Sequence, residues 1–490
     1  MLAAMPDSAL SPVSAGGASP RAGGDACPGT LRLHRADDGA LARVRIPGGV
    51  LDPGRADALL AAAERFGDGE LHLTSRGNVQ LRGLGTECGG ALAGLLADAG
   101  LLPSAAHERV RNIVASPLAG LDGSPSLAAR LGELDRLVCA SPAAAALSGR
   151  FLFALDAGGG DVDALGADVT VIAEGPDALL RIGAEDEVFR VPGAEAPRAA
   201  LLAAEAFLRA TRDSAAARDS TATRDSAAAR DSTATRDSAA APGSGTAPDS
   251  ARTPGSGTRR SAAWRVKDLP DDVRAGLVRT IGSATAGPAV HRPRPRTATA
   301  PAPGQVGTTA SPSPGPGPGP GPVGTTTALS IGVPLGRLTP AQWRLLTETA
   351  RRYGGELRLT PWRGIVIPFG AGRDEAAKAL RTLDAEGLIT APDSPWTGVG
   401  ACIGHPGCAK SLSDVRAEAG AAVGPPGRLP VYWSGCERRC GHPHGEWIDV
   451  VATPDGHRIS HVRGERRDAP TTVRNDPARL AAAVAEARAL

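Results

Sequence analysis

Two stretches of this 490-residue chain repeat each other, and this repeat limits the fold more than any other sequence feature. Residues 43–53 (RVRIPGGVLDP) match residues 331–340 (IGVPLGRLTP), with two prolines and a leucine at a constant offset of 287 residues. Residues 70–74 (ELHLT) match residues 356–360 (ELRLT) at an offset of 286 residues. A shared order of motifs over such a distance predicts two copies of one structural unit.

Each unit predicts a β-α-β arrangement. Pro53 and Pro340 stand where a helix begins, at a position whose backbone N–H has no helical partner. Apolar residues at spacings of three, four and seven predict helices over 54–66 and 341–353. The following strands alternate apolar residues, which are Leu71, Leu73, Val79 and Leu81 in the first unit and Leu357, Leu359, Ile365 and Ile367 in the second. This pattern predicts an α+β protein with approximate two-fold symmetry and a functional site where the halves meet.

Residues 208–327 have a composition that opposes a packed core. Arg-Asp-Ser recurs there with a period of six residues, which matches neither a helix face nor a strand face. Proline then alternates with glycine or serine over residues 312–322, where neither a hydrogen-bond ladder nor apolar burial is available. We therefore expect this segment to be a disordered linker and residues 1–25 to be disordered. The island at residues 264–269 is compatible with docking on a neighbour or with disorder.

Charge and composition argue against several classes of protein. The formal net charge is +2 and aromatic residues make up 3%, which argues against a nucleic-acid binder with a basic field or base-stacking surface. No run reaches 18 apolar residues, so we expect no membrane span. The N-terminus lacks the basic flank and apolar region of a secretion signal, so we expect a cytoplasmic protein. Lysine is rare, since 51 of the 54 basic residues are arginine.

Four of the seven cysteines fall within 39 residues of the second half. Their spacing is C-x5-C followed by C-x3-C, formed by Cys402, Cys408, Cys436 and Cys440. Clustered thiolates hold zinc or an iron–sulfur cluster. The C-x5-C spacing is wider than a usual zinc knuckle, and flanking glycines leave backbone N–H groups able to approach inorganic sulfide, so iron–sulfur is favoured over zinc. We assign the scattered Cys27, Cys88 and Cys139 to packing, because disulfides are not expected without a secretion signal.

Together these features resemble the sulfite and nitrite reductase superfamily. The cysteine spacing matches its [4Fe–4S] signature, residues 73–83 (LTSRGNVQLRG) resemble its L-T-x-R-Q-x-x-Q-x-[RH]-G motif, and residues 109–122 (RVRNIVASPLAGLD) resemble its R-N…P-L-A-G-[LI]-D segment. The resemblance implies duplicated ferredoxin-like half-domains plus two related α/β lobes of the sulfite/nitrite reductase type, with internal pseudo-two-fold symmetry. The expected half-domain and lobe span 26–101 and 102–207 in the first half, and 328–392 and 393–480 in the second.

Reductases of this superfamily bind sirohaem and place two lysines of a K-F-K run near its iron. Here the matching residues 150–152 read Arg-Phe-Leu, and leucine can neither move a proton nor stabilise a bound oxyanion. Residues 356–364 (ELRLTPWRG), 401–408 (ACIGHPGC) and 434–443 (SGCERRCGHP) instead resemble the precorrin-3B synthase family. That family hydroxylates precorrin-3A at C20 with O2 and NADH-derived electrons and closes a γ-lactone. It uses a [4Fe–4S] cluster and a mononuclear non-haem iron, and no sirohaem is expected.

The resemblance implies a cleft that holds the carboxylates of a tetrapyrrole. Arginine suits this task because its guanidinium stays charged and binds a carboxylate through two parallel hydrogen bonds. Catalytic roles are implied for Arg43, Arg111 and Arg150. Substrate contacts are implied for Arg45, Thr74, Arg76, Gln80, Arg82, Arg109, Asn112, Arg358 and Arg363.

Oxygen chemistry in this family implies an iron with open positions, often held by two histidines and a carboxylate. His442, His444 and Glu446 supply that set beside the last cysteine, with His72 and His405 as alternatives. The [4Fe–4S] cluster is expected to carry single electrons, because four cysteines saturate its four irons. No G-x-G-x-x-G follows a predicted strand, so a separate reductase or ferredoxin is expected to deliver the electrons.

Two other functions remain open on the sequence. One is a sirohaem-dependent sulfite or nitrite reductase, which an intense Soret-type absorption band would identify. The other is a non-catalytic iron–sulfur electron carrier or a zinc-stabilised binding protein, which metal and acid-labile sulfide analysis would identify.

Overall fold

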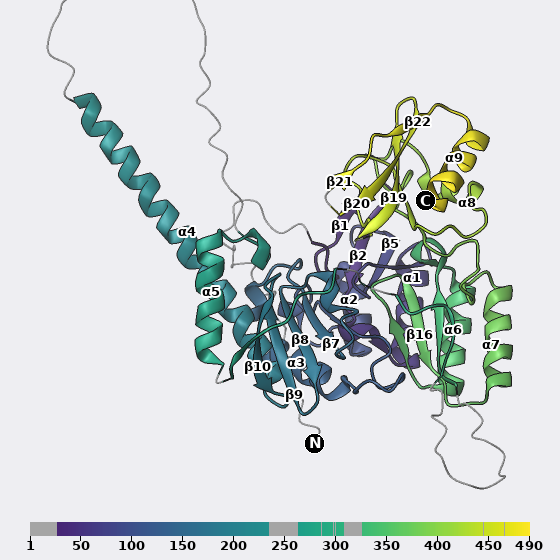
Figure 1. Ribbon diagram of the computed structural model, residues 1–490, viewed down its shortest axis with the longest axis horizontal. Helices are drawn as coiled ribbons and strands as arrows, with labels where there is room; N and C mark the ends of the chain where they lie inside the picture. Colours follow the sequence, from purple (N-terminus) through teal and green to yellow (C-terminus); the bar gives the residue numbers. More distant parts are fainter. Residues whose placement is uncertain are drawn as a thin grey trace, which may run out of the picture.

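Four β-sheets and their covering helices make up the described part of the computed structural model (Figure 1). The described residues are 27–234, 263–307 apart from Ala286, Thr297 and Thr299, and 326–490 apart from His444 and Glu465. The predicted disorder of residues 1–25 lies outside these ranges. Within them, no helix has both the length and the apolar character that crossing a membrane requires.

The first half-domain packs two helices on a five-stranded sheet. The helices are α1 (Pro53–Phe66) and α2 (Gly89–Asp98). In spatial order the strands are β1 (His34–Ala36), β2 (Gly39–Val44), β5 (Val79–Leu84), β4 (Leu71–Leu73) and β14 (Arg337–Leu338). Helix α1 begins as predicted, with Pro53 in its first turn and the Asp52 carboxylate accepting a hydrogen bond from the Arg55 N–H at 2.9 Å.

The second half-domain repeats this plan. Its helices are α6 (Pro340–Tyr353) and α7 (Arg373–Ala385). Its strands, in spatial order, are β12 (Gly304–Gly307), β13 (Thr326–Gly332), β16 (Gly364–Pro368), β15 (Leu357–Leu359) and β3 (Val50–Leu51). Thr339 and Gln342 cap α6 reciprocally, each side chain accepting a hydrogen bond from the other residue's backbone N–H.

The two half-domains exchange strands. Strand β3 of the first pairs with β15 of the second, and β14 of the second pairs with β4 of the first. Apolar residues of both half-domains therefore form one continuous core. Near the symmetry axis the Trp343 indole N–H donates to the Ala56 carbonyl at 2.8 Å, and these residues are separated by the repeat offset of 287. The predicted α+β class and two-fold arrangement are confirmed.

Each half-domain is followed by a lobe built on a mixed sheet. The first lobe orders its strands as β11 (Ala289–His291), β10 (Glu187–Pro192), β9 (Asp177–Ile182), β8 (Val169–Glu174), β7 (Phe153–Asp156) and β6 (Ile113–Ala115). The second orders them as β17 (Val399–Ala401), β18 (Val431–Ser434), β19 (Glu446–Thr453), β20 (Gly456–Arg463) and β21 (Arg466–Arg467), with β22 (Thr471–Val473) also pairing with β20. In each lobe the first three strands along the chain are parallel and the fourth is antiparallel to the third, so the lobes are related.

Five helices cover the lobes. Those of the first lobe are α3 (Ala128–Ala140), α4 (Ala196–Ala234) and α5 (Asp271–Ala284). Those of the second are α8 (Val415–Ala421) and α9 (Pro477–Ala489). The predicted end of the second lobe at residue 480 is too early, because α9 continues beyond it and buries Leu480 and Val484 in the core of that lobe.

The prediction of a disordered linker over 208–327 is wrong for the described residues of that range. Helix α4 continues through the Arg-Asp-Ser repeats to Ala234, because alanine-rich sequence readily extends a helix whose first turns are already packed. Helix α5 buries Leu277 and Ile281 in the core of the first lobe, and β11 extends the sheet of that lobe. Residues 235–262 and 308–325 lie outside the described part of the chain.

Replacing Trp343 with phenylalanine tests the joint between the half-domains. The change removes the N–H that the Ala56 carbonyl accepts and leaves a cavity around a fully buried side chain, so the free energy of unfolding falls by about 2–4 kcal/mol. Urea denaturation followed by circular dichroism measures the change. The control Lys378→Ala alters an exposed position on α7 and leaves the midpoint in place. An unchanged midpoint for Trp343→Phe would contradict the packing described here.

Candidate functional site

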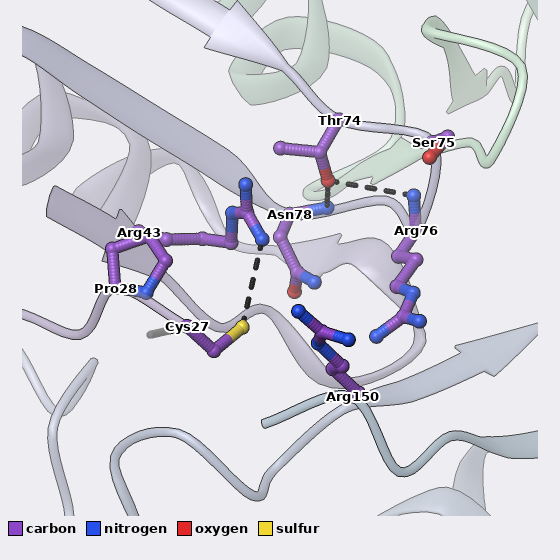
Figure 2. Close-up of a pocket in the computed structure, with 8 residues that line it drawn as sticks. All are labelled: Cys27, Pro28, Arg43, Thr74, Ser75, Arg76, Asn78 and Arg150. Carbon is purple, nitrogen blue, oxygen red and sulfur yellow. Dashed lines mark hydrogen bonds between the residues drawn. The ribbon is translucent and has the colours of Figure 1, made fainter. Parts of the chain in front are cut away.

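A cavity of about 320 Å³ lies where the first half-domain meets the first lobe (Figure 2). Figure 2 shows the guanidinium groups of Arg43, Arg76 and Arg150 around it, together with the Cys27 thiol. Arg43 comes from β2, Arg76 from the turn between β4 and β5, and Arg150 from the segment before β7. We call this space the arginine cavity; its lining residues are Cys27, Pro28, Arg43, Thr74, Ser75, Arg76, Asn78 and Arg150.

The turn between β4 and β5 holds Arg76 at the cavity. The Thr74 hydroxyl accepts hydrogen bonds from the N–H groups of Asn78 at 3.1 Å and Arg76 at 3.4 Å, and Gly77 supplies the positive φ of 64° that the turn requires. The Arg76 guanidinium donates to the Gly149 carbonyl at 3.3 Å. Burial and the charges of neighbouring arginines lower the pKa of Arg76 to about 10, so the side chain is still charged at neutral pH.

The assignment of Cys27 to packing is wrong. Its Sγ atom lines the arginine cavity and lies 3.3 Å from Arg45 Nη2 and 3.8 Å from Arg43 Nη1. Its S–H donates to the Gly149 carbonyl at 3.4 Å. The one signal in the sequence is the Cys-Pro-Gly motif at residues 27–29, which does not show which side chains lie near the thiol. Cys88, in contrast, packs against the half-domain core as predicted.

Three of the predicted site arginines pair with carboxylates away from this cavity, namely Arg82, Arg111 and Arg358. Arg111 is 5% exposed and donates to both carboxylate oxygens of Asp135, at 2.8 and 2.7 Å. Arg358 donates to the Glu356 carboxylate at 2.8 Å and to two carbonyl groups of the first lobe. A buried guanidinium requires such partners. The catalytic role predicted for Arg111 and the substrate contact predicted for Arg358 are therefore not reproduced at the arginine cavity.

Other predicted residues lie next to the cavity without lining it. Arg45 is 3% exposed and its Nε–H donates to the Arg109 carbonyl at 3.2 Å. The Asn112 amide accepts a hydrogen bond from the Asn78 amide at 3.0 Å. Gln80 lies on β5 and, like Arg45, Arg109 and Asn112, is not among the lining residues.

A second cavity, of about 340 Å³, lies between the first half-domain and the second lobe. Arg82 joins the two parts, because its guanidinium binds both carboxylate oxygens of Asp38 at 2.7 Å and the Gly407 carbonyl at 2.8 Å. His72 and His405, which the sequence offers as alternative iron ligands, both line this space. Its remaining lining residues are Asp38, Asp68, Glu70, Arg82, Leu335, Arg337, Ile403, Pro406, Gly407, Asp414, Arg416 and Ala417.

Asp68, Glu70 and His72 form the one group among the described residues whose ligand atoms lie close enough to hold a metal ion, all within 4.8 Å. His72 is 6% exposed, and its Nε2 atom has no hydrogen-bond partner and lies 3.9 Å from an oxygen of each carboxylate. Burial lowers the pKa of His72, which leaves the ring neutral at pH 7. Arg337 binds both oxygens of Glu70, and Arg416 Nη1 lies 3.4 Å from His72 Nδ1. Two of these three residues therefore also contact an arginine.

The predicted iron ligands beside the cysteines have other partners. The His442 ring stacks on Trp447, with ring centroids 5.4 Å apart. The Glu446 carboxylate pairs with His461 Nε2 at 2.8 Å. His444 lies outside the described residues, so the set stays a prediction. Arg363 lies near this loop and donates to the Gly441 carbonyl at 3.0 Å.

The four clustered cysteines meet at one edge of the second-lobe sheet. Cys402 follows β17 and Cys436 follows β18, and these parallel strands end at the same edge. Burial and the thiols of the three other cysteines raise the pKa of Cys440, which indicates that the four groups are close. The backbone N–H of Gly435 donates to Cys402 Sγ at 3.3 Å, and the Tyr432 hydroxyl donates to the Cys440 carbonyl at 2.6 Å.

Zinc and a [4Fe–4S] cluster require different distances between the sulfur atoms of their four cysteines. No three of the four Sγ atoms lie within 4.8 Å of one another, although all four cysteines are among the described residues. A tetrahedral zinc site with Zn–S bonds of about 2.3 Å brings its sulfur atoms to roughly 3.8 Å. A [4Fe–4S] cluster spreads its ligands more widely, because each cysteine binds a different iron. Binding of zinc would therefore require these sulfur atoms to move closer together, and the [4Fe–4S] cluster stays a prediction.

Comparison with known proteins agrees with this architecture. The family model described as "Nitrite/Sulfite reductase ferredoxin-like half domain" matches residues 33–93 and 320–384, one segment in each half. The NirA protein of Mycobacterium tuberculosis has a similar structure, with a TM-score of 0.58 at 20% sequence identity over 88% of this chain and 77% of that one. These matches show that each half contains a segment similar to the nitrite/sulfite reductase ferredoxin-like half domain and that the chain has a fold similar to that of NirA.

Curated relatives include two kinds of enzyme. A precorrin-3B synthase of Sinorhizobium sp is 40% identical over 97 residues, 20% of this chain and 20% of the relative. A chloroplastic ferredoxin–nitrite reductase of Zea mays is 32% identical over 122 residues, 23% of this chain and 21% of the relative. The aligned parts thus span about a fifth of each of these relatives.

Thiol labelling tests the position of Cys27. Cys27 lines a cavity, whereas burial raises the pKa of the Cys139 thiol and suppresses its reactive thiolate. Iodoacetamide should therefore modify Cys27 about fivefold faster than Cys139 in the folded protein. Peptide mass spectrometry over a time course gives both rates, with the half-buried Cys88, whose thiol pKa is also raised by desolvation, as a second reference. Equal rates for Cys27 and Cys139 would contradict the cavity.

Proposed function

We propose that this chain is an oxygen-dependent monooxygenase that hydroxylates precorrin-3A at C20 and closes a γ-lactone, the reaction of the precorrin-3B synthase family. The arginine cavity carries the proposal, because three guanidinium groups face one space and suit a ligand with several carboxylates. The similarity to the Sinorhizobium precorrin-3B synthase supports the same reaction.

The cavity residues bind and orient rather than transfer protons. A guanidinium stays charged at neutral pH, so the side chains of Arg43, Arg76 and Arg150 can donate hydrogen bonds to an acetate or propionate carboxylate of the substrate but cannot release a proton to it. The Thr74 hydroxyl and Asn78 amide add neutral hydrogen-bonding groups at the same wall. Carboxylates held at several fixed points would set the orientation of the macrocycle and thereby select C20.

Leu152 separates this proposal from the reductase alternative. It is 4% exposed and packs in an apolar cluster with Val114 and Trp362, at the position where the reductases carry a lysine. Reduction of nitrite or sulfite requires several protons to reach a bound anion, and neither leucine nor arginine supplies them. The reductase alternative draws its support from the nitrite reductases among the curated relatives.

A [4Fe–4S] cluster held by Cys402, Cys408, Cys436 and Cys440 is the second part of the proposal. When bound, the cluster would supply single-electron transfer. Cys440 is exposed, so one corner of the site faces the surface, where a separate reductase or ferredoxin could deliver NADH-derived electrons. The Gly435 N–H beside Cys402 Sγ would stabilise the charge of a coordinated thiolate.

A mononuclear iron, which the family resemblance implies, has its most suitable donors in Asp68, Glu70 and His72. The unpartnered, buried Nε2 of His72 is the observation that fits a metal ion, since a neutral imidazole and two carboxylates are iron ligands. When bound, iron would supply the activation of O2. Arg337 already binds Glu70 and would hold that carboxylate in place. We prefer this set to the residues around Glu446, because Glu446 is paired with His461.

Serine substitution tests the cluster. Cys402→Ser should abolish acid-labile sulfide and lower the iron content of anaerobically purified protein, because a cluster ligand is lost. Cys88→Ser is the matched control, since that thiol packs in the half-domain core, and it should retain both. Colorimetric iron and sulfide assays measure the outcome. Wild-type protein with zinc and no sulfide would end the enzyme proposal in favour of a zinc-stabilised binding protein.

Arg76→Ala tests the role of the arginine cavity. Loss of a charge-assisted contact with a substrate carboxylate should raise the KM for precorrin-3A by about 10- to 100-fold. The control Arg136→Ala removes an exposed arginine paired with Glu133 and should leave KM unchanged. Steady-state kinetics with precorrin-3A, O2, NADH and a reductase provide the measurement. An unchanged KM for Arg76→Ala would remove Arg76 from the substrate site.

The reaction itself is tested with the full-length protein and isotopically labelled oxygen. Incorporation of one labelled oxygen atom into precorrin-3A by mass spectrometry would support the monooxygenase. An intense Soret-type band together with nitrite or sulfite reduction would support the sirohaem reductase instead. Fast turnover with NADH and O2 and no added reductase would contradict the expected external electron donor.

A further inference from the structure

Residues 263–269, which we call the Trp264 segment, dock beside the arginine cavity. Ala263, Val266 and Leu269 are at most 5% exposed and belong to the core of the first lobe. This anchoring places the Trp264 ring under the Arg150 guanidinium, with 4.1 Å between the guanidinium carbon and the ring centroid. Of the two interpretations that the sequence left open, docking is the one that the structure has.

Asp168 fixes this segment relative to the cavity. Its carboxylate is 1% exposed and accepts hydrogen bonds from the Val266 N–H at 2.7 Å and from Arg265 Nε at 2.6 Å. The same carboxylate accepts a hydrogen bond from the Leu152 N–H at 2.9 Å. One buried group therefore holds both the residue after Trp264 and the backbone two residues beyond Arg150, and this sets the distance between the two side chains.

The contact with Trp264 leaves the hydrogen-bonding edge of Arg150 unused. No carboxylate pairs with Arg150 among the described residues, in contrast to the bidentate pairs of Arg82 and Arg111. A guanidinium that stacks on an aromatic face keeps its N–H groups in its own plane, where they can still bind a carboxylate. Trp264 thus restrains the cation without consuming its donors.

We infer that Trp264 is a positioning residue of the arginine cavity, which holds the Arg150 guanidinium ready for a carboxylate of the ligand. The identity of the ligand as a polycarboxylate tetrapyrrole rests on the proposed function, whereas the restraint on Arg150 does not. Tighter binding of a ligand carboxylate follows, because a preorganised guanidinium loses less conformational freedom on binding.

Chemical labelling tests the restraint without any ligand. Phenylglyoxal modifies accessible arginines, and in Trp264→Leu the Arg150 side chain should react about threefold to fivefold faster than in the wild type, because the indole no longer covers one face of it. Trp264→Phe retains an aromatic face and should stay within twofold of the wild type. Arg136, which is exposed on helix α3 and paired with Glu133, is the internal reference in the same peptide mass spectra. Unchanged labelling of Arg150 in Trp264→Leu would overturn the inference.

Binding of uroporphyrin, an octacarboxylate porphyrin, tests whether the restraint on Arg150 strengthens the binding of a ligand with carboxylates. Fluorescence titration of the full-length protein should show about fivefold weaker binding for Trp264→Leu and a smaller loss for Trp264→Phe. The control Lys267→Ala alters an exposed residue of the same segment and should bind as the wild type does. Circular dichroism verifies that the variants are folded.

A double-mutant cycle separates positioning from a general structural effect. In an Arg150→Met background, Trp264→Leu should weaken uroporphyrin binding by less than a further twofold, because Trp264 acts through Arg150. An equal loss in both backgrounds would overturn the inference. Wild-type protein that does not bind uroporphyrin would count against the proposed function, while the labelling result would still decide the role of Trp264.

Discussion

The exchange of strands β3 and β14 is the constraint on which the rest of the structure depends. Without its partner each half-domain sheet would lack its outer strand and expose an unpaired edge, which is a costly and aggregation-prone state. Because the exchange is reciprocal, apolar residues of the two half-domains form one core. The arginine cavity and the second cavity are consequences, since each forms where the first half-domain meets a lobe.

Much of this fold could be predicted because its signals are local. The apolar periodicity around residues 54–66 and 341–353 and the prolines before them define the helices almost to the residue. The strand exchange could not be predicted, because β3 and β14 are two residues long and their pairing is set by tertiary contacts. The prediction of a disordered linker was wrong for α4. It relied on the lack of large apolar residues at helical spacing, whereas the alanine content of this segment is sufficient for a helix.

The site was predictable in its residue types and less so in their roles. Arg43, Arg76 and Arg150 line the cavity as the motifs implied, yet Arg111 has the same motif character and is paired with Asp135. Which arginine remains available is decided by carboxylates elsewhere in the chain, and a motif does not contain that information. Cys27 was missed for the same reason, because its proximity to the guanidinium groups arises only when the N-terminal segment packs beside β2.

The contact between Trp343 and Ala56 joins two positions that the repeat makes equivalent, as residues at the axis of a symmetric homodimer do. In a homodimer a substitution appears in both copies, whereas in a single chain each copy can change alone. The two copies differ here in this way: the second lobe carries four clustered cysteines, whereas the matching stretch of the first lobe carries a single cysteine, Cys139. Joining the copies covalently allows the two halves to diverge, with clustered cysteines in one and the arginine cavity in the other.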